Sequence, residues 1–164
     1  MTREMTVSDS IVVDTDADTL YAAISDPTRM GSWSPENLGA VVEEPRESAY
    51  VGMVFDGRNK RGRAKWVTRC TVTVADPGSA FEFRVHAIGV KSPSLKAPNA
   101  TWRYDFETVP GGTKVTETWT DDRRKWPDAA ALIFDKIVTS GKTFPQFQRR
   151  NIAKTLANLR KHYA

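Results

Sequence analysis

The sequence is poor in the residues that hold metals and form disulfides. Its 164 residues include a single cysteine, Cys70, and two histidines, His86 and His162. A single cysteine excludes a disulfide within the chain, and two histidines with one cysteine make no zinc-binding pattern. We therefore expect no metal site. Cys70 lies on the apolar side of an alternating segment and is interpreted as a small buried residue rather than a nucleophile.

Long apolar runs are also missing. No stretch approaches the roughly 20 apolar residues that a membrane-spanning helix needs, and the first ten residues, MTREMTVSDS, lack the apolar core of a signal peptide. An unpaired cysteine suits a reducing compartment. We expect a cytoplasmic protein in which residues 1–164 form one domain, because this length is enough to bury a substantial core.

The chain has no phosphate-binding loop. The nearest approach to one is Gly111-Gly112-Thr113-Lys114. It has the wrong spacing for a P-loop and joins two strand-like segments instead of opening a helix. No dinucleotide-binding pattern follows a strand either. We therefore expect no nucleotide and no other cofactor.

Net negative charge is absent too, since the formal net charge is +4. Basic residues concentrate in 58–63 and 142–161. A nucleic-acid patch is one interpretation, but acidic residues are interleaved elsewhere and no nucleic-acid-binding motif is present. We expect solvated surfaces and no nucleic-acid partner, while the basic C-terminal segment leaves open a weak contact with anionic membrane surfaces. The charges of residues 121–125 are expected to neutralise one another at the surface.

What the chain does have is a series of alternating segments, clearest in residues 101–120. A Pro-Gly-Gly turn at 110–112 separates two segments whose side chains alternate between two faces. The aromatic face of the first segment carries Trp102, Tyr104 and Phe106. A turn of even length places Glu117 and Trp119 on that same face. Because an unpaired carboxylate in an apolar wall is costly, the pattern indicates a lined cavity and hence a ligand.

Other segments complete the fold prediction. Strand-like alternation recurs in 5–13, 39–47, 53–59, 64–75 and 79–88, and residues 89–99 are expected to form a loop. Two short helices are expected near residues 16–26 and 28–33. Apolar spacing typical of a helix appears in 128–139 and, on one side only, after Pro145. The order of strand, two short helices, six strands and a long C-terminal helix predicts an α+β fold, with a curved antiparallel sheet around the last helix.

A set of short sequence pieces is spread over nearly the whole chain. They are Asp26-Pro27, Trp33-Ser34-Pro35, Gly57-Arg58-Asn59, Gly62, Trp66, Cys70-Thr71-Val72, Phe81-Glu82-Phe83, Thr101-Trp102-Arg103-Tyr104, Gly112-Thr113, Val115-Thr116-Glu117, Asn151, Thr155-Leu156 and Leu159. In their order and spacing the chain resembles the START-like (SRPBCC) superfamily with the helix-grip, or Bet v 1-like, fold. Within it, the chain is most similar to the polyketide cyclase/dehydrase and lipid-transport group. The resemblance implies a cavity for a hydrophobic or amphipathic small molecule, although a fold alone does not determine a function.

The residues expected to line this cavity lie on the aromatic strand faces or follow the first helices. They are Trp33, Phe55, Asn59, Trp66, Thr68, Phe83, Trp102, Tyr104, Glu117 and Trp119. The tryptophans suit either core packing or the lining for a ring-containing ligand. Glu117 has three interpretations: a structural carboxylate with a hydrogen-bonded partner, an anchor for a polar group of the ligand, or a general acid or base. Arg69 and His86 fall on the opposite faces and are expected outside the cavity.

These patterns favour a binding protein. We hypothesise that a monomer or homodimer binds or transports a lipid-like or polyketide-like molecule between the sheet and the C-terminal helix. The alternative is a polyketide cyclase or dehydratase that uses Glu117 as acid or base. No catalytic residue is assigned, because no second acid, base or nucleophile stands out beside Glu117 in the sequence.

Overall fold

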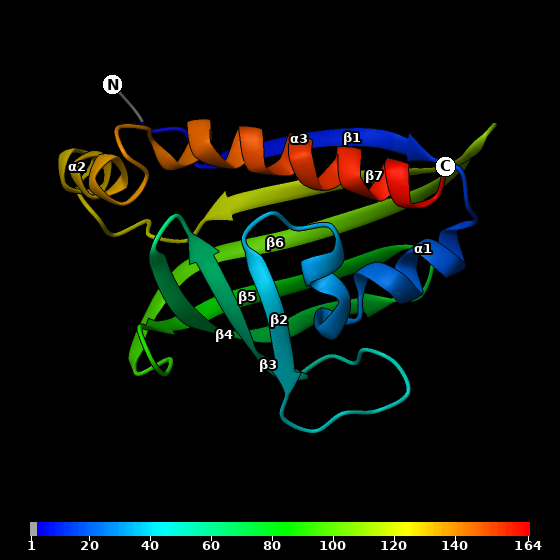
Figure 1. Cartoon of the computed structure of the whole chain (residues 1–164), viewed down its shortest axis with the longest axis horizontal. Coiled ribbons are helices and arrows are strands. Elements are labelled where there is room, and N and C mark those ends of the chain that lie inside the picture. The colour runs from blue at the N-terminus through cyan, green and yellow to red at the C-terminus, as the bar shows by residue number, and fades with distance from the viewer. Residues whose placement is uncertain (1–2) are drawn as a thin grey trace.

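The computed structural model describes residues 3–164, which form one seven-stranded antiparallel sheet, three α-helices and one 3₁₀ helix (Figure 1). The strands are β1 (Thr6–Val13), β2 (Asn37–Val42), β3 (Val54–Arg61), β4 (Ala64–Asp76), β5 (Ala80–Gly89), β6 (Leu95–Val109) and β7 (Gly112–Asp121). The helices are α1 (Ala17–Ile24), η1 (Pro27–Ser32), α2 (Asp128–Val138) and α3 (Phe144–His162). The predicted α+β arrangement, including its element order, is confirmed.

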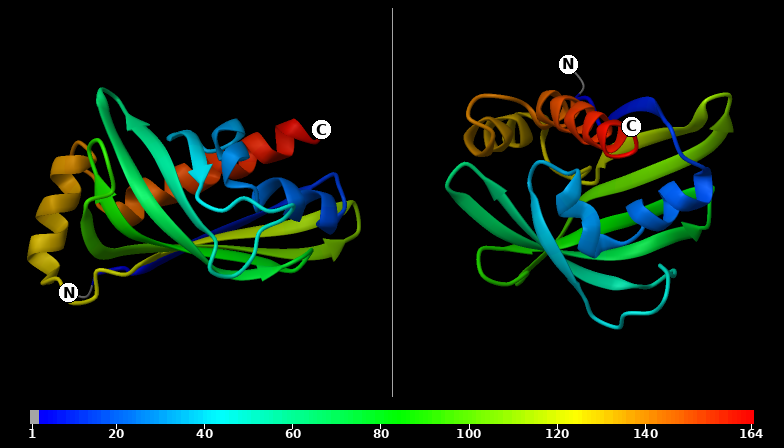
Figure 2. Two further views of the ribbon diagram at one scale, coloured as in Figure 1. Left: turned by 90° about the horizontal axis from the view of Figure 1, so that it is seen from below. Right: turned by 45° about the vertical axis from the view of Figure 1, so that its right-hand side comes forward.

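The sheet curves around α3. Its strand order is β1-β7-β6-β5-β4-β3-β2, so β2 to β7 form a meander and β1 pairs with the last strand. Irregular registers in β2, β4 and β5 bend these strands. Helix α3 packs against β1 and β7, and η1 packs against β2 at the other side of the concave face (Figure 2). The concave face of the sheet is therefore the face that α3, α1 and η1 cover.

Side-chain caps begin α1, η1 and α3. The Asp16 carboxylate accepts a hydrogen bond from the Thr19 amide at 2.8 Å and starts α1, and Asp26 caps η1 in the same way. Thr143 and Gln146 form a reciprocal capping box at the start of α3. Such caps each stabilise a helix by roughly 1 kcal/mol, so the turns before α1, η1 and α3 are set locally.

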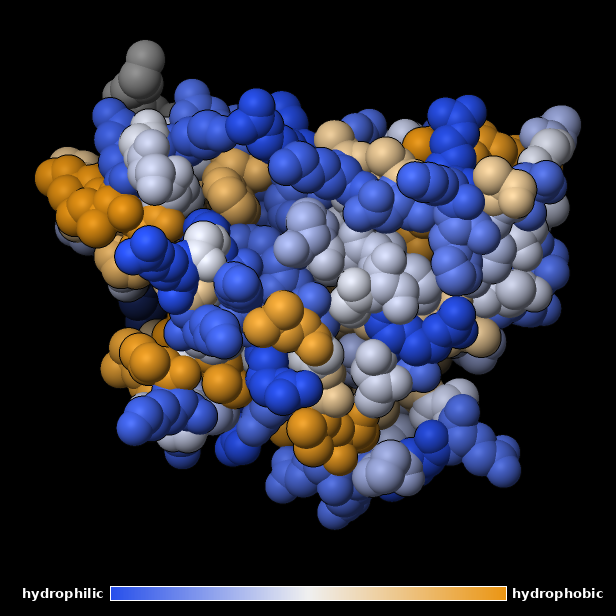
Figure 3. Space-filling view, viewed as in Figure 1, coloured by the Kyte–Doolittle hydropathy of each residue, from blue (hydrophilic) through white to orange (hydrophobic). Residues whose placement is uncertain are grey.

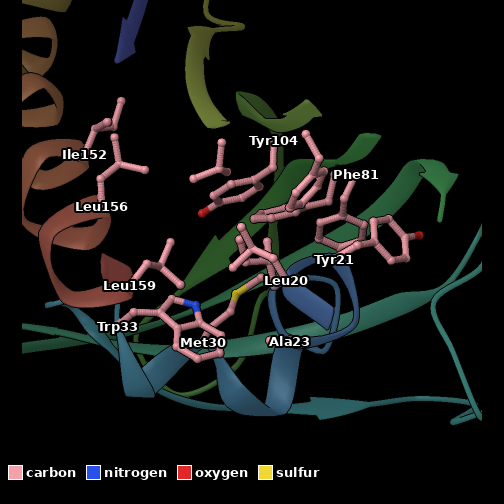
Figure 4. Close-up of a cluster of buried hydrophobic side chains, with 14 of the residues drawn as sticks. Leu20, Tyr21, Ala23, Met30, Trp33, Phe81, Tyr104, Ile152, Leu156 and Leu159 are labelled. Carbon is pink, nitrogen blue, oxygen red and sulfur yellow. The ribbon is translucent and has the colours of Figure 1, made fainter. Parts of the chain in front are cut away.

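The core lies between α3, α1 and the concave face of the sheet. The α3 residues Ile152, Leu156 and Leu159 are almost fully buried and point toward the sheet, where Tyr104 lies (Figure 4). Each such side chain stabilises the fold by about 1.5–3 kcal/mol relative to an exposed one. The apolar stripe predicted after Pro145 therefore does what its spacing indicated: it holds α3 on the sheet.

The segment expected to be a loop, residues 89–99, is partly a strand. β6 begins at Leu95, and Leu95 pairs with Ile88 of β5. The ladder is interrupted between Val85 and Ala87, opposite the part of β6 that contains Pro98. Proline has no amide hydrogen to donate to a ladder and is tolerated at such irregularities. The prediction was wrong for residues 95–99 because proline was read as ending the strand.

The charges of 121–125 are not all at the surface, which corrects a second prediction. Asp121 is completely buried and accepts hydrogen bonds from the Arg123 guanidinium at 3.0 and 2.8 Å. Arg123 also lies 2.9 Å from Asp135 of α2, and the Arg3 guanidinium lies 3.6 Å from Asp121. The period of two that buries Glu117 and Trp119 also turns Asp121 inward, and α2 then covers it.

The β6–β7 turn consists of two residues, Pro110 and Gly111, because Val109 pairs with Gly112. Gly111 and Gly112 both have positive φ angles, of 92° and 139°. A Cβ atom on Gly112 would overlap the carbonyl oxygen of Val13, whereas a Cβ atom on Gly111 would meet nothing within 4 Å. The turn therefore has the even length that puts Glu117 on the aromatic face, and Gly112 lets it approach β1.

We predict that Gly112→Ala destabilises the protein more than Gly111→Ala. Both substitutions strain a positive-φ residue, at roughly 1–3 kcal/mol. Only Gly112→Ala also requires the backbone at Val13 to move away. Urea denaturation should show Gly112→Ala less stable than Gly111→Ala by at least about 2 kcal/mol. Equal losses would mean that the close approach to Val13 does not constrain the turn.

Candidate functional site

Glu117 and Tyr104 form a buried polar pair on the concave face of the sheet. They are directly opposite each other on β7 and β6, and the Tyr104 hydroxyl donates a hydrogen bond to Oε1 of Glu117 at 2.9 Å. Glu117 is 2% exposed and Tyr104 is 7% exposed. The second carboxyl oxygen, Oε2, is buried and has no hydrogen-bond partner among residues 3–164. One polar atom of the pair is thus left for a partner outside the chain.

Burial changes the protonation of this pair. Desolvation raises the pKa of Glu117 to about 8; the hydrogen bond from Tyr104 opposes this rise, and the negative charge of Asp9 adds to it. Burial and the neighbouring Glu117 also raise the pKa of Tyr104 well above its usual value. The raised pKa of Glu117 favours its protonated form at neutral pH. That form is a neutral acid that can both donate and accept a hydrogen bond.

Aromatic side chains surround the pair. Trp102 lies opposite Trp119 on the β6–β7 ladder and opposite Phe83 on the β5–β6 ladder. The rings of Phe55 and Phe83 meet edge to face with centroids 5.2 Å apart. Trp119, Phe55 and Phe83 are buried, while Trp102 keeps part of its surface exposed. The structure thus brings these four residues together as the sequence pattern predicted.

A second polar group lies on β3 and β4. The Asn59 amide donates a hydrogen bond to the Thr68 hydroxyl at 3.3 Å, and Asn59 is the register partner of Trp66. All three are half-buried. Trp66 and Thr68 lie four and two residues before Cys70 on β4 in alternating positions, so all three side chains face the concave side of the sheet. Trp66 and Thr68 are only half-buried because the concave side is not fully covered at this end.

Trp33 stands apart from the other predicted residues. It follows η1 and is 2% exposed, and it lies beside Leu159 of α3 and Met30 (Figure 4). Its carbonyl oxygen accepts a hydrogen bond from Asn158 at 2.8 Å. Trp33 therefore joins η1 to the C-terminal half of α3 and closes that part of the concave face.

Three polar residues of α3, Gln148, Asn151 and Thr155, also face the interior but are not among the residues predicted to line the cavity. All three are at least nine-tenths buried, and Nδ2 of Asn151 donates to Oε1 of Gln148 at 3.2 Å. Oδ1 of Asn151 is buried without a partner among residues 3–164. Their spacing of three and four residues was the available signal, because it places polar side chains beside the apolar stripe of α3.

Arg61 closes the space between β3 and α3 at one end. Its guanidinium lies 3.9 Å from the ring centroid of Phe147 and 5.2 Å from that of Trp66. It donates to the Glu36 carboxylate at 2.6 and 3.2 Å and to the carbonyl oxygen of Val138 at 3.1 Å. These contacts join the β3–β4 hairpin to α2 and α3, and we call them the Arg61 latch.

Two of the best-defined surface pockets in the described part of the chain can be compared with the predicted cavity residues. The first, of about 220 Å³, lies outside the Arg61 latch between the β3–β4 hairpin and α3. The second, of about 310 Å³, is lined by Arg84, Val85, His86, Pro98, Asp122 and Arg124. None of the ten residues predicted to line a cavity borders either pocket, so the enclosed cavity between sheet and helix stays a prediction.

The residues expected to be inert are accounted for by their surroundings. Burial raises the pKa of the Cys70 thiol to about 12, which keeps it protonated and unreactive. Arg69 pairs with Asp56 at 2.9 Å, and His86 Nε2 lies 2.7 Å from the Thr71 hydroxyl on the convex face. In residues 3–164 no group of three or more His, Cys, Asp or Glu side chains is placed to hold a metal ion. No helix in this part of the chain is long and apolar enough to cross a membrane.

Solved structures share this fold. A polyketide-cyclase-like protein from Corynebacterium glutamicum is 28% identical over 99% of this chain and 93% of its own, with a TM-score of 0.56. Major latex-like protein 151 from Panax ginseng is 11% identical, with 98% and 99% covered and a TM-score of 0.68. The di-domain ARO/CYC StfQ from the steffimycin biosynthetic pathway is 17% identical, with 97% and 50% covered and a TM-score of 0.67. The last two likenesses show the fold alone, which is the helix-grip, Bet v 1-like fold.

The sequence comparison is consistent with that fold. No curated protein matches the chain. A family model described as polyketide cyclase / dehydrase and lipid transport matches residues 4–164, which is nearly the whole chain. The chain therefore belongs to the polyketide cyclase/dehydrase and lipid transport family.

Proposed function

We propose that the protein binds a hydrophobic or amphipathic small molecule, lipid-like or polyketide-like, between the sheet and α3. The observation that supports this most strongly is the Glu117–Tyr104 pair. Nothing in residues 3–164 satisfies Oε2 of Glu117, and an unpaired buried polar atom costs roughly 1–3 kcal/mol. A ligand oxygen that accepts a hydrogen bond from the protonated Glu117 carboxyl would remove this cost.

The surroundings of the pair favour a ligand with a large apolar body. Burying apolar surface contributes about 25 cal/mol per Å², and Phe83, Trp102 and Trp119 supply flat apolar surface beside Glu117. The neutral acid would select a carbonyl or hydroxyl oxygen rather than a carboxylate at the inner end of the ligand. Asn59 and Tyr104 would orient the same molecule.

Ligand entry would need the concave face to open. Trp66, Trp102, Asn59 and Thr68 face the concave side and are already partly exposed, so the aromatic surface continues toward the Arg61 latch. Releasing Arg61 from Phe147 and Glu36 would separate the β3–β4 hairpin from α3 and widen this end.

The family supports binding in general terms. Its description combines polyketide cyclase, dehydrase and lipid transport, and the relative from Corynebacterium glutamicum is named polyketide-cyclase-like. Transport of a lipid would require contact with a membrane. The exposed cations Lys154, Arg160 and Lys161 of α3 would support a weak contact with anionic lipid surfaces.

A cyclase or dehydratase activity is the second candidate, and one observation favours it. Glu117 and Tyr104 are two titratable groups in hydrogen-bond contact, both with raised pKa values. A protonated Glu117 could donate a proton to a hydroxyl that leaves as water, and the remaining carboxylate, held by Tyr104, could accept the proton lost from the adjacent carbon as the double bond forms. The sequence placed both residues on one face, but it assigned no acid–base role to Tyr104.

For binding, we predict that an apolar ligand changes the tryptophan fluorescence of the protein through Trp102. In a titration with a neutral fatty-acid methyl ester, the wild type and Trp126→Phe should respond alike, because Trp126 lies over Arg123 away from the concave face. Trp102→Phe should lose most of the response. An unchanged response in Trp102→Phe, or none in the wild type, would contradict binding at this site.

For Glu117, we predict that stability falls as pH rises. The folded-state pKa of about 8 exceeds the ordinary 4.5, so folding binds a proton between these values and stability is lost from pH 4.5 to pH 8. Glu117→Gln removes this loss. Denaturation at several pH values should show the free energy of unfolding of Glu117→Gln rising relative to that of the wild type from pH 4.5 to pH 8. The relative gain is at most about 1.4 kcal/mol for each unit by which the Glu117 pKa is raised. Parallel pH profiles would mean that Glu117 titrates normally.

For catalysis, Glu117→Gln and Tyr104→Phe separate the two candidates. If the protein is a dehydratase, Glu117→Gln should abolish turnover of a polyketide-like substrate while the substrate still binds, and Tyr104→Phe should shift the pH dependence of the rate. Turnover that survives Glu117→Gln would exclude Glu117 as the acid.

A further inference from the structure

The pocket outside the Arg61 latch has four cations among its lining residues. It is lined by Pro35, Glu36, Lys60, Arg61, Gly62, Phe147, Arg150, Asn151 and Lys154. Figure 3 shows hydrophilic side chains over this part of the molecule, between α3 and the β3–β4 hairpin. The pocket holds about 220 Å³, which is room for a small polar head group.

The positive charge of this pocket is not balanced by the protein. Its only carboxylate, Glu36, is engaged by Arg61 at 2.6 Å. Lys60, Arg150 and Lys154 have no carboxylate within 4.0 Å among residues 3–164. Lys60 also lies directly opposite Lys65 on the β3–β4 ladder. Two like charges in directly opposite positions destabilise a pair of strands. An anion in the pocket would relieve this repulsion.

Asn151 provides an independent sign of a ligand. It is 9% exposed and borders the pocket, and its Oδ1 is buried with no hydrogen-bond partner in the described part of the chain. Its Nδ2 is taken by Gln148. As placed, this amide oxygen can only accept a hydrogen bond and would not hold an anion. Turning the Asn151 and Gln148 amides together would present a donor to the same space instead.

The pocket adjoins the proposed binding space. Arg61 and Phe147 line the pocket on one side, and the Arg61 guanidinium lies 5.2 Å from the ring centroid of Trp66, which faces the concave side of the sheet. A molecule that passes the latch would therefore place one end among cations and its body along Trp66 toward Glu117. The two polar ends of the space differ, since the inner end is a neutral acid and the outer end is cationic.

We propose that this pocket binds the anionic head group, a carboxylate or a phosphate, of the amphipathic ligand. The inference rests on the proposed function and names the ligand class: an apolar body with a neutral oxygen at its inner end and an anion at its outer end. Arg150 and Lys154 hold the anion together with Lys60. Once the ligand has entered, Arg61 pairs again with Glu36 and lies beside the junction of head and body.

The test uses three ligands with the same chain: dodecanoate, methyl dodecanoate and dodecyl phosphate. Their dissociation constants are measured at pH 7 by titration calorimetry, below the concentrations at which they form micelles. The wild type should bind an anion at least about tenfold more tightly than the ester, as expected for charge-assisted hydrogen bonds. The preferred anion tells whether the head group is a carboxylate or a phosphate.

Two double variants are compared. Arg150→Gln/Lys154→Gln removes two pocket cations of α3, and the matched control Lys114→Gln/Lys125→Gln removes two exposed cations outside α3 that do not line the pocket. The first should bring the ratio of ester to anion dissociation constants close to one, and the control should keep the wild-type ratio. Circular dichroism confirms that both variants are folded.

The outcomes separate this inference from the proposed function. Equal affinity of the wild type for ester and anions overturns the anionic head group while leaving an apolar site in place. Loss of the preference in both double variants also overturns it, because the effect would then be one of overall charge. If none of the three ligands binds, the proposed function itself fails and this inference falls with it.

Discussion

The register of the β6–β7 hairpin is the constraint on which the rest of the structure depends. Its two-residue turn places Tyr104 opposite Glu117 and Trp102 opposite Trp119. A slip of one residue would turn every β7 side chain to the other face, which would expose Glu117 and leave the concave face without its polar pair. The same phase carries Asp121 inward at the far end of β7. One alternating pattern thus sets both the candidate site and the buried ion pairs that hold α2.

Those ion pairs position the helix that covers the site. Asp121 and Asp135 flank Arg123, and Oδ2 of Asp135 also accepts a hydrogen bond from the Phe144 amide at the start of α3, at 2.9 Å. Buried charges stabilise little in total, but removing one partner leaves the other unpaired at a cost of roughly 3–5 kcal/mol. The arrangement therefore specifies where α2 ends and α3 begins. From there, the apolar stripe of α3 places Gln148, Asn151 and Thr155 over the concave face.

The sequence predicted most of the fold, because alternation is a local signal. The order of the elements and the shared face of Glu117 and the aromatic residues follow from periodicity. What it could not predict depends on contacts between distant segments. The Arg61 latch joins residues 36, 61, 138 and 147, and no spacing along the chain reveals such a group. Likewise, Trp33 proved to join η1 to α3, a role that its type alone does not specify.

The proposed function depends on Glu117 being a neutral acid whose carboxyl donates a hydrogen bond to a ligand oxygen. The most direct measurement is a carbon-13 NMR titration of the Glu117 side-chain carboxyl, with and without a saturating apolar ligand that carries a carbonyl group. The account predicts a pKa of about 8 in the free protein and a further rise when the ligand is bound, because the bound oxygen accepts a hydrogen bond from the protonated form. A pKa near the ordinary 4.5 that does not respond to the ligand would contradict it.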